Sequence, residues 1–160
     1  MPQRTVGRVQ LASNKTFTAN YDSPNLHREV DRFTEVVLTL AVTAATHTNE
    51  TYDLYVWTTD GFSKWDIAHF PQIATTGAKT FTARLTSQNQ IPANVTNATP
   101  GVANNDPSFI QTDTPGANQG IKTLGAGIVR HAPFGEWLGY SLVVAGTAPS
   151  ITFTLLAALR

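Results

Sequence analysis

The stretch from residue 34 to residue 45, TEVVLTLAVTAA, decides the fold class of this chain. Every second position in its centre carries a large apolar side chain: Val36, Leu38, Leu40 and Val42. This period of two is the spacing of a β-strand, in which successive side chains point to opposite faces. The stretch therefore predicts a strand with one face in a hydrophobic core.

Similar short runs recur along the chain and are separated by turn residues such as Asp60-Gly61. The predicted strands are residues 6–11, 16–21, 34–45, 52–59, 63–73, 79–87, 127–131, 137–145 and 150–159. We expect a turn at residues 12–15 and one short helical turn within residues 26–32. About eight strands without a long helical pattern predict an all-β fold, an antiparallel β-sandwich of the jelly-roll kind. An immunoglobulin-like sandwich fits nearly as well.

The length of 160 residues predicts a single domain. Residues 88–119 are rich in Asn, Pro, Gly and Thr and predict one long irregular loop. Connections of this length are uncommon in compact domains and are usually functional. We therefore expect this loop, together with a candidate N-terminal arm at residues 1–13, to reach a neighbouring subunit.

Charged residues make up only 14% of the chain, and they balance to a formal net charge of zero. No block of like charges is present, so we expect neither nucleic acid nor a membrane as partner. The apolar stretch 138–159 is interrupted by Gly139, Gly146 and Pro149, and we do not expect it to span a bilayer. With 24 threonines, the surface suits β-sheets packed against neighbouring proteins.

Residues that could carry chemistry are few. Cysteine is absent, which excludes disulfides, thiolate catalysis and Cys-based metal sites. Asp66 and His69 have a D-x-x-H spacing, but on a strand this spacing places them on opposite faces. We therefore predict that His69 is a hydrogen-bonded residue at a sheet edge. No nucleophile turn or phosphate loop is present, and we expect no enzyme, no cofactor and no metal.

Aromatic residues leave two interpretations open. Tyr55 and Trp57 lie on the strand face opposite Leu54 and Val56. An exposed aromatic platform could stack on sugar rings, as in a carbohydrate-binding module. Alternatively, another chain or the long loop covers this face, which we favour because aromatics on paired strands pack well across strands. The last strand also becomes apolar on both faces at Leu156, which indicates contact with another chain.

Two segments resemble small structural proteins of tailed phages. The first block is DLYVWTTDG at 53–61 with KWDIAHF at 64–70, a strand, a D-G turn and a W-D-x-I-A-H-F-like stretch. The second is YSLVVAGTAPSITFT at 140–154, which is similar to the closing hairpin of that group. Members of the group often have a double Gly with Thr before the Trp, where this chain has Gly61-Phe62-Ser63-Lys64.

The resemblance implies a β-sandwich virion protein on the capsid exterior, made in the host cytoplasm. It implies a capsid decoration (cement) protein that forms a homotrimer and clamps neighbouring copies of the major capsid protein. A tail, neck or head-completion component is the alternative within virions, and a carbohydrate-binding module, with a glycan as partner, is the alternative from another class. The side chains expected in protein contacts are Val6, Arg8, Val9, Tyr55, Trp57, Phe109, Ile110 and Leu156.

Overall fold

The computed structural model describes residues 7–62, 64–87, 126–129 and 133–160. This part of the chain consists of β-strands and one short 3₁₀ helix, η1. The elements are β1 (Gly7–Phe17), β2 (Tyr21–Asp22), β3 (His27–Arg28), η1 (Val30–Arg32), β4 (Glu35–Ala45), β5 (Thr51–Thr59), β6 (Lys64–His69), β7 (Lys79–Thr86), β8 (Ile128–Val129), β9 (Trp137–Ala145) and β10 (Ile151–Leu159). None of the helices in these ranges is long and apolar enough to cross a membrane.

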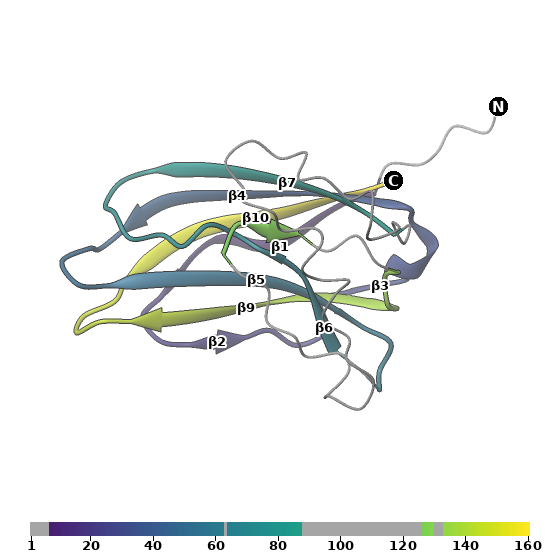
Figure 1. Cartoon of the computed structure of the whole chain (residues 1–160), viewed down its shortest axis with the longest axis horizontal. Helices are drawn as coiled ribbons and strands as arrows, with labels where there is room; N and C mark the ends of the chain where they lie inside the picture. Colours follow the sequence, from purple (N-terminus) through teal and green to yellow (C-terminus); the bar gives the residue numbers. More distant parts are fainter. Residues whose placement is uncertain (1–6, 63, 88–125, 130–132) are drawn as a thin grey trace, which may run out of the picture.

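The strands form two antiparallel sheets that pack face to face (Figure 1). The four-stranded sheet has the order β1-β10-β4-β7, and the six-stranded sheet has the order β2-β9-β5-β6-β8, with β3 also paired to β9. This confirms the predicted antiparallel β-sandwich. The jelly-roll topology stays a prediction, with which the strand order is compatible.

The hydrophobic core lies between the sheets, and the alternation of β4 explains how it forms. The four large apolar residues of β4 are buried, while the residues between them are partly exposed. Its neighbour β10 alternates in the same way, with Ile151, Phe153, Leu155, Ala157 and Leu159 in the core. A pleated sheet with one face in the core requires this alternation, and each buried Leu or Phe side chain stabilises the fold by about 1.5–3 kcal/mol.

The turn predicted at residues 12–15 is wrong. β1 runs through these residues and pairs with β10 from Gly7 to Phe17, although its register shifts twice, between Gln10 and Ala12 and between Ala12 and Lys15. Pairing with β10 therefore extends through the expected turn, and residues 7–13 of the candidate arm belong to this strand. Residues 1–6 and the whole of the predicted long loop, residues 88–119, lie outside the described residues.

The predicted strand 16–21 is wrong as a single strand, because β1 ends at Phe17 and β2 begins at Tyr21. Other local predictions are confirmed with shorter bounds. The predicted helical turn is η1. The predicted strand 63–73 is β6, which ends at His69, and Ile73 forms an isolated bridge with Tyr52. Among the described residues near 127–131, only Ile128 and Val129 form a strand. Three of the strands contain two residues each, which is why the structure shows more strands than the eight or so that we expected.

Candidate interaction surfaces

The outer face of the four-stranded sheet is mostly uncharged. Cross-strand pairing arranges its outward side chains in rows that run β1-β10-β4-β7. The first row is Arg8, Ala158, Val37 and Arg84, the second is Gln10, Leu156, Thr39 and Thr82, and the third lacks a β1 member and is Thr154, Ala41 and Thr80. Threonine and small apolar residues thus cover the middle of this face.

The charges of this face lie toward one end. Glu35 forms ion pairs with Arg84, at 2.5 Å, and with Arg160, at 3.4 Å. Arg8 makes no ion pair with any residue that the structure describes. Its guanidinium is therefore a positive charge on the face that remains available to a partner.

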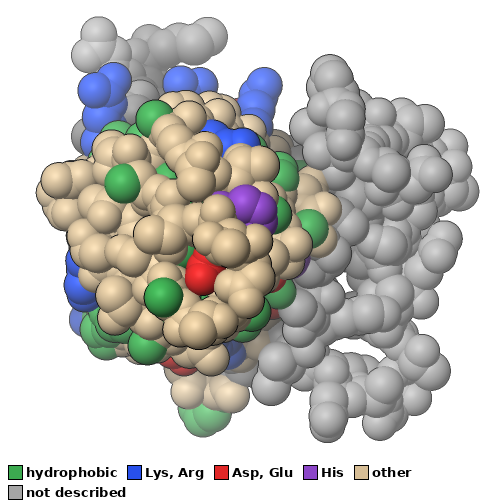
Figure 2. Space-filling view, turned by 90° about the vertical axis from the view of Figure 1, so that its left-hand side faces the viewer, with side chains coloured by type: hydrophobic (Ala, Val, Ile, Leu, Met, Phe, Trp, Pro, Cys, Tyr) green, Lys and Arg blue, Asp and Glu red, His purple; other side chains and the backbone are tan. Residues whose placement is uncertain are grey.

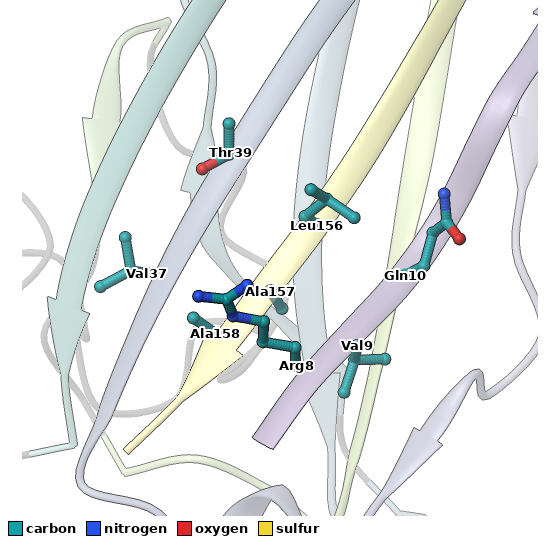
Figure 3. A pocket seen from close by; sticks show the side chains of 8 residues that line it. All are labelled: Arg8, Val9, Gln10, Val37, Thr39, Leu156, Ala157 and Ala158. Atoms are coloured by element: carbon teal, nitrogen blue, oxygen red, sulfur yellow. The ribbon is translucent and has the colours of Figure 1, made fainter. Parts of the chain in front are cut away.

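A shallow open groove with a volume of about 340 Å³ lies at this end of the outer face (Figure 3). Its lining is Arg8, Val9, Gln10, Val37, Thr39, Leu156, Ala157 and Ala158, and we call it the Arg8–Leu156 groove. Figure 3 shows the Arg8 side chain reaching from β1 toward β10, beside Ala158. Leu156 is 42% exposed, which is high for a large apolar side chain in the middle of a sheet. Three predicted contact residues, Arg8, Val9 and Leu156, therefore come together here.

The turn between β5 and β6 carries the most exposed apolar side chain among the described residues, Phe62, which is 99% exposed. The turn is held by two short hydrogen bonds. The Phe62 N–H donates to Asp60 Oδ1 at 2.8 Å, and the Gly61 N–H donates to Thr59 Oγ1 at 3.0 Å. Gly61 has φ +94°, a conformation that favours glycine. Our contact prediction omitted Phe62, although its place in a D-G turn was a signal for exposure.

Trp57 lies on the outer side of the six-stranded sheet, as predicted, but it is only 2% exposed. Its Nε1–H donates to Asp22 Oδ1 at 3.2 Å, and Lys64 Nζ lies 4.2 Å from its ring centroid. Gly139, directly opposite on β9, leaves room for the ring. Residues of the same chain therefore bury Trp57, so almost none of its ring is exposed to a sugar or to a partner protein.

Asp22 is the centre of the polar network above Trp57. Besides the indole, its carboxylate accepts hydrogen bonds from Lys64 Nζ at 2.8 and 2.9 Å and from Ser141 Oγ at 2.5 Å. Burial alone would raise the pKa of Asp22, but the bonds from Lys64 and Ser141 and the positive charge of Lys64 outweigh it. The pKa therefore lies below its usual value. The network links β2, β5, β6 and β9 and acts as a structural clamp.

Tyr55 lies beside a second polar group on the same sheet. Its ring stacks on His69, with the ring centroids 4.0 Å apart. His69 Nε2 lies 2.9 Å from Asp53 Oδ1, and Gln72 Nε2 donates to Asp53 Oδ2 at 2.8 Å. Burial raises the pKa of Tyr55, and the carboxylates of Asp53 and Asp66 add to this shift. His69 is hydrogen-bonded as predicted, on a strand next to the two-residue β8, and Asp53 is one of its partners.

At the opposite end of the sandwich, the β4–β5 and β9–β10 turns meet (Figure 1), and Figure 2 shows that few charged side chains lie on this end. Glu50 is buried there and accepts hydrogen bonds from the backbone N–H groups of Thr48 at 2.6 Å, Asn49 at 3.2 Å and Ala148 at 3.2 Å. The bond from Thr48 is the main reason why the pKa of Glu50 lies below its usual value. Glu50 thus ties the two turns together.

The other two tryptophans and the remaining predicted contact residues do not form a common site. Trp65 packs against the core, and Arg28 lies over the ring of Trp137 at 5.5 Å. Val6, Phe109 and Ile110 lie outside the described residues. Within those residues, no group of three or more His, Asp or Glu side chains could hold a metal ion.

Comparison with protein-family models, with curated proteins and with solved structures finds no match to this chain. The case for a function therefore depends on the surfaces described above and on the resemblance of the two sequence blocks.

Proposed function

We propose that this chain is a virion structural protein, a capsid decoration protein that binds the major capsid protein and stabilises the phage head. The observation that carries the proposal is the outer face of the four-stranded sheet. It is broad, built on paired strands, and covered in its middle by Thr, Ala, Val and Leu side chains. The centres of protein–protein interfaces are similarly depleted of charge.

A face of this kind favours binding over catalysis. Its side chains come from four hydrogen-bonded strands, so their positions are fixed before binding and little conformational entropy is lost. Threonine hydroxyl groups can exchange hydrogen bonds with a partner backbone, and the exposed Leu156 adds apolar contact area. A decoration protein requires these properties, because it works by holding other proteins in place.

The resemblance to tailed-phage proteins supports the virion assignment. The first block falls on the β5–β6 hairpin. The second falls on β9, β10 and the turn between them, which crosses from the six-stranded to the four-stranded sheet, so the closing hairpin that the resemblance implies is not formed. The strands β5, β6 and β9 of the two blocks are neighbours in the six-stranded sheet. The burial of Trp57 weighs against the carbohydrate-binding alternative, whereas a tail or neck position within the virion is compatible with the same surface.

Cryo-electron microscopy of purified virions tests the proposal. We expect density for this sandwich on the outside of the head, in hundreds of copies. Six or twelve copies at the neck or tail would instead support the alternative of a tail or neck component. Absence from the particle would overturn the virion assignment altogether.

A capsid-binding assay tests which face is used. Ala41→Arg places a charge in the third row of the outer face, between Thr154 and Thr80. We expect it to abolish cosedimentation with capsids. The matched control is Val143→Arg, at a position that is 45% exposed on the other sheet. Loss of binding in the control alone would assign the capsid contact to the six-stranded sheet.

A further inference from the structure

Phe62 and the Arg8–Leu156 groove are complementary features at the same end of the sandwich. Phe62 follows the end of β5, where Thr59 pairs with Trp137 at the start of β9. The groove lies where β1 begins and β10 ends, since Arg8 pairs with Ala158. Both features are therefore remote from the β9–β10 turn, but they belong to different sheets.

We propose that Phe62 of one copy inserts into the Arg8–Leu156 groove of a second copy of this chain. The inference deepens the proposed function, because it assigns the contact through which copies of the protein bind one another. It gives the exposed Phe62 and the open groove a common explanation.

The size of the groove fits a phenyl ring. Its volume is about 340 Å³. An apolar cavity of about 150 Å³ in another protein already binds benzene. Leu156, Val37 and Ala158 supply apolar walls, and the Arg8 guanidinium lies at the same groove, where it can lie over an inserted aromatic ring.

The charges of the two surfaces are also complementary. Asp60 is exposed in the turn that presents Phe62, and its Oδ1 accepts the Phe62 N–H. Arg8 at the groove has no ion-pair partner among the described residues. Insertion of Phe62 would bring a carboxylate toward this guanidinium, so attraction between the charges favours the same orientation as the apolar contact.

Phe62 can enter this groove only in a second copy, because it is almost fully exposed in its own chain and so does not fill its own groove. The turn is held by its two hydrogen bonds, which reduces the entropy lost when Phe62 is buried. The inserted residue and the groove are different patches of one surface. Copies can therefore join head to tail, and they close into a ring if the rotation between them allows it.

Sedimentation equilibrium of the purified protein tests the contact. We expect the wild type to self-associate and Phe62→Ala to weaken self-association by about 10- to 100-fold, the loss expected for one buried aromatic side chain. Leu156→Glu should weaken it at least as much, because it places a charge in the groove. The control, Val143→Ala, truncates an apolar side chain on the other sheet that is about as exposed as Leu156 and should associate like the wild type.

A mixing experiment separates this contact from other modes of association. Phe62→Ala retains an intact groove, and Leu156→Glu retains an intact Phe62. At a concentration where the wild type associates and each weakened variant alone is mainly monomeric, an equal mixture should form pairs, because one intact Phe62 meets one intact groove. If Leu156→Glu does not fold, Thr39→Glu in the same groove replaces it.

Three results would overturn the inference: a monomeric wild type at the highest soluble concentration, unchanged association of Phe62→Ala, or no pairing in the mixture. Capsid cosedimentation tests the proposed function independently of the Phe62 contact. Capsid binding by a protein that does not self-associate would refute the Phe62 contact and leave decoration standing. Self-association through Phe62 without capsid binding would refute decoration alone.

Discussion

Trp57 on β5 lies directly opposite Gly139 on β9, and a β-carbon at residue 139 would overlap the indole ring. The same β-carbon would lie 2.7 Å from Ser23 Oγ, so Ser23 also restricts the space at residue 139. Because the indole N–H donates to Asp22 and Lys64 Nζ lies 4.2 Å from the ring centroid, the ring cannot move far without disturbing the polar network.

We expect Gly139→Ala to destabilise the fold by about 1–3 kcal/mol, the usual cost of inserting an extra carbon into a packed site. For a chain of this size, this corresponds to a decrease in Tm of roughly 2–12 °C. Thermal unfolding followed by tryptophan fluorescence checks it, with a red-shifted folded-state emission if Trp57 is displaced. An unchanged Tm and emission spectrum would show that the position of the Trp57 ring does not require a residue without a β-carbon at position 139.

Asp22→Ala should leave the buried indole N–H of Trp57 without its acceptor, at a cost of about 1–3 kcal/mol at neutral pH. Since the folded-state pKa of Asp22 lies below the unfolded value of about 3.9, its contribution is complete above that value. It is lost as the pH falls through the folded-state pKa. Denaturant unfolding of Asp22→Asn, which removes the charge and nearly keeps the shape, should therefore differ from the wild type at pH 7 and converge with it below the folded-state pKa.

Glu50→Gln should lower Tm at pH 7, because a neutral amide is a weaker acceptor for the three backbone N–H groups that bind the carboxylate. The pKa of Glu50 is lowered by folding, so the difference from the wild type should disappear as the pH falls below about 4. Calorimetry at several pH values measures this. A difference that persists at low pH would indicate that the side-chain shape, and not the charge, stabilises the turns.

Asn14 in β1 has φ +41°, and its side chain accepts a hydrogen bond from the Thr43 hydroxyl at 3.3 Å. We expect Asn14→Val to destabilise the protein by about 1–3 kcal/mol, because a β-branched residue is strained in the left-handed region. Asn14→Gly, which adopts this conformation without strain, should cost less. Chemical denaturation compares the two variants, and an equal loss in both would mean that the hydrogen bond, and not the backbone, determines the effect.

The fold could be predicted where local sequence and long-range packing agree. The alternation in β4 places Val36 and Leu38 in the core, and the Asp60-Gly61 dipeptide forms the turn that it predicts. The strand face of Trp57 was also predicted correctly. The favoured interpretation covers this face with another chain or the long loop, whereas the described residues around the ring come from β2, β6 and β9. Only the folded chain brings these residues together.

The expected turn in β1 failed for a related reason. Ala-Ser-Asn-Lys at residues 12–15 has the composition of a turn, but the Asn14 N–H finds an acceptor in Thr154 Oγ1 at 2.9 Å. This partner is far away in the sequence, so the strand can continue through a locally unfavourable segment. The candidate contact surface was predicted in part. Leu156 and Arg8 were identified from the sequence, whereas Phe62 was identified only from its exposure in the structure.

The two register shifts in β1 limit how copies of this chain can associate through their backbones. β1 is an edge strand of eleven residues, and a regular edge of that length would offer its unpaired backbone groups to strands of other molecules. The shifts and the left-handed Asn14 interrupt this row of donors and acceptors. Growth by strand addition, which has no natural end and leads to fibrils, is thereby discouraged. Contacts between side chains can still build assemblies of fixed size.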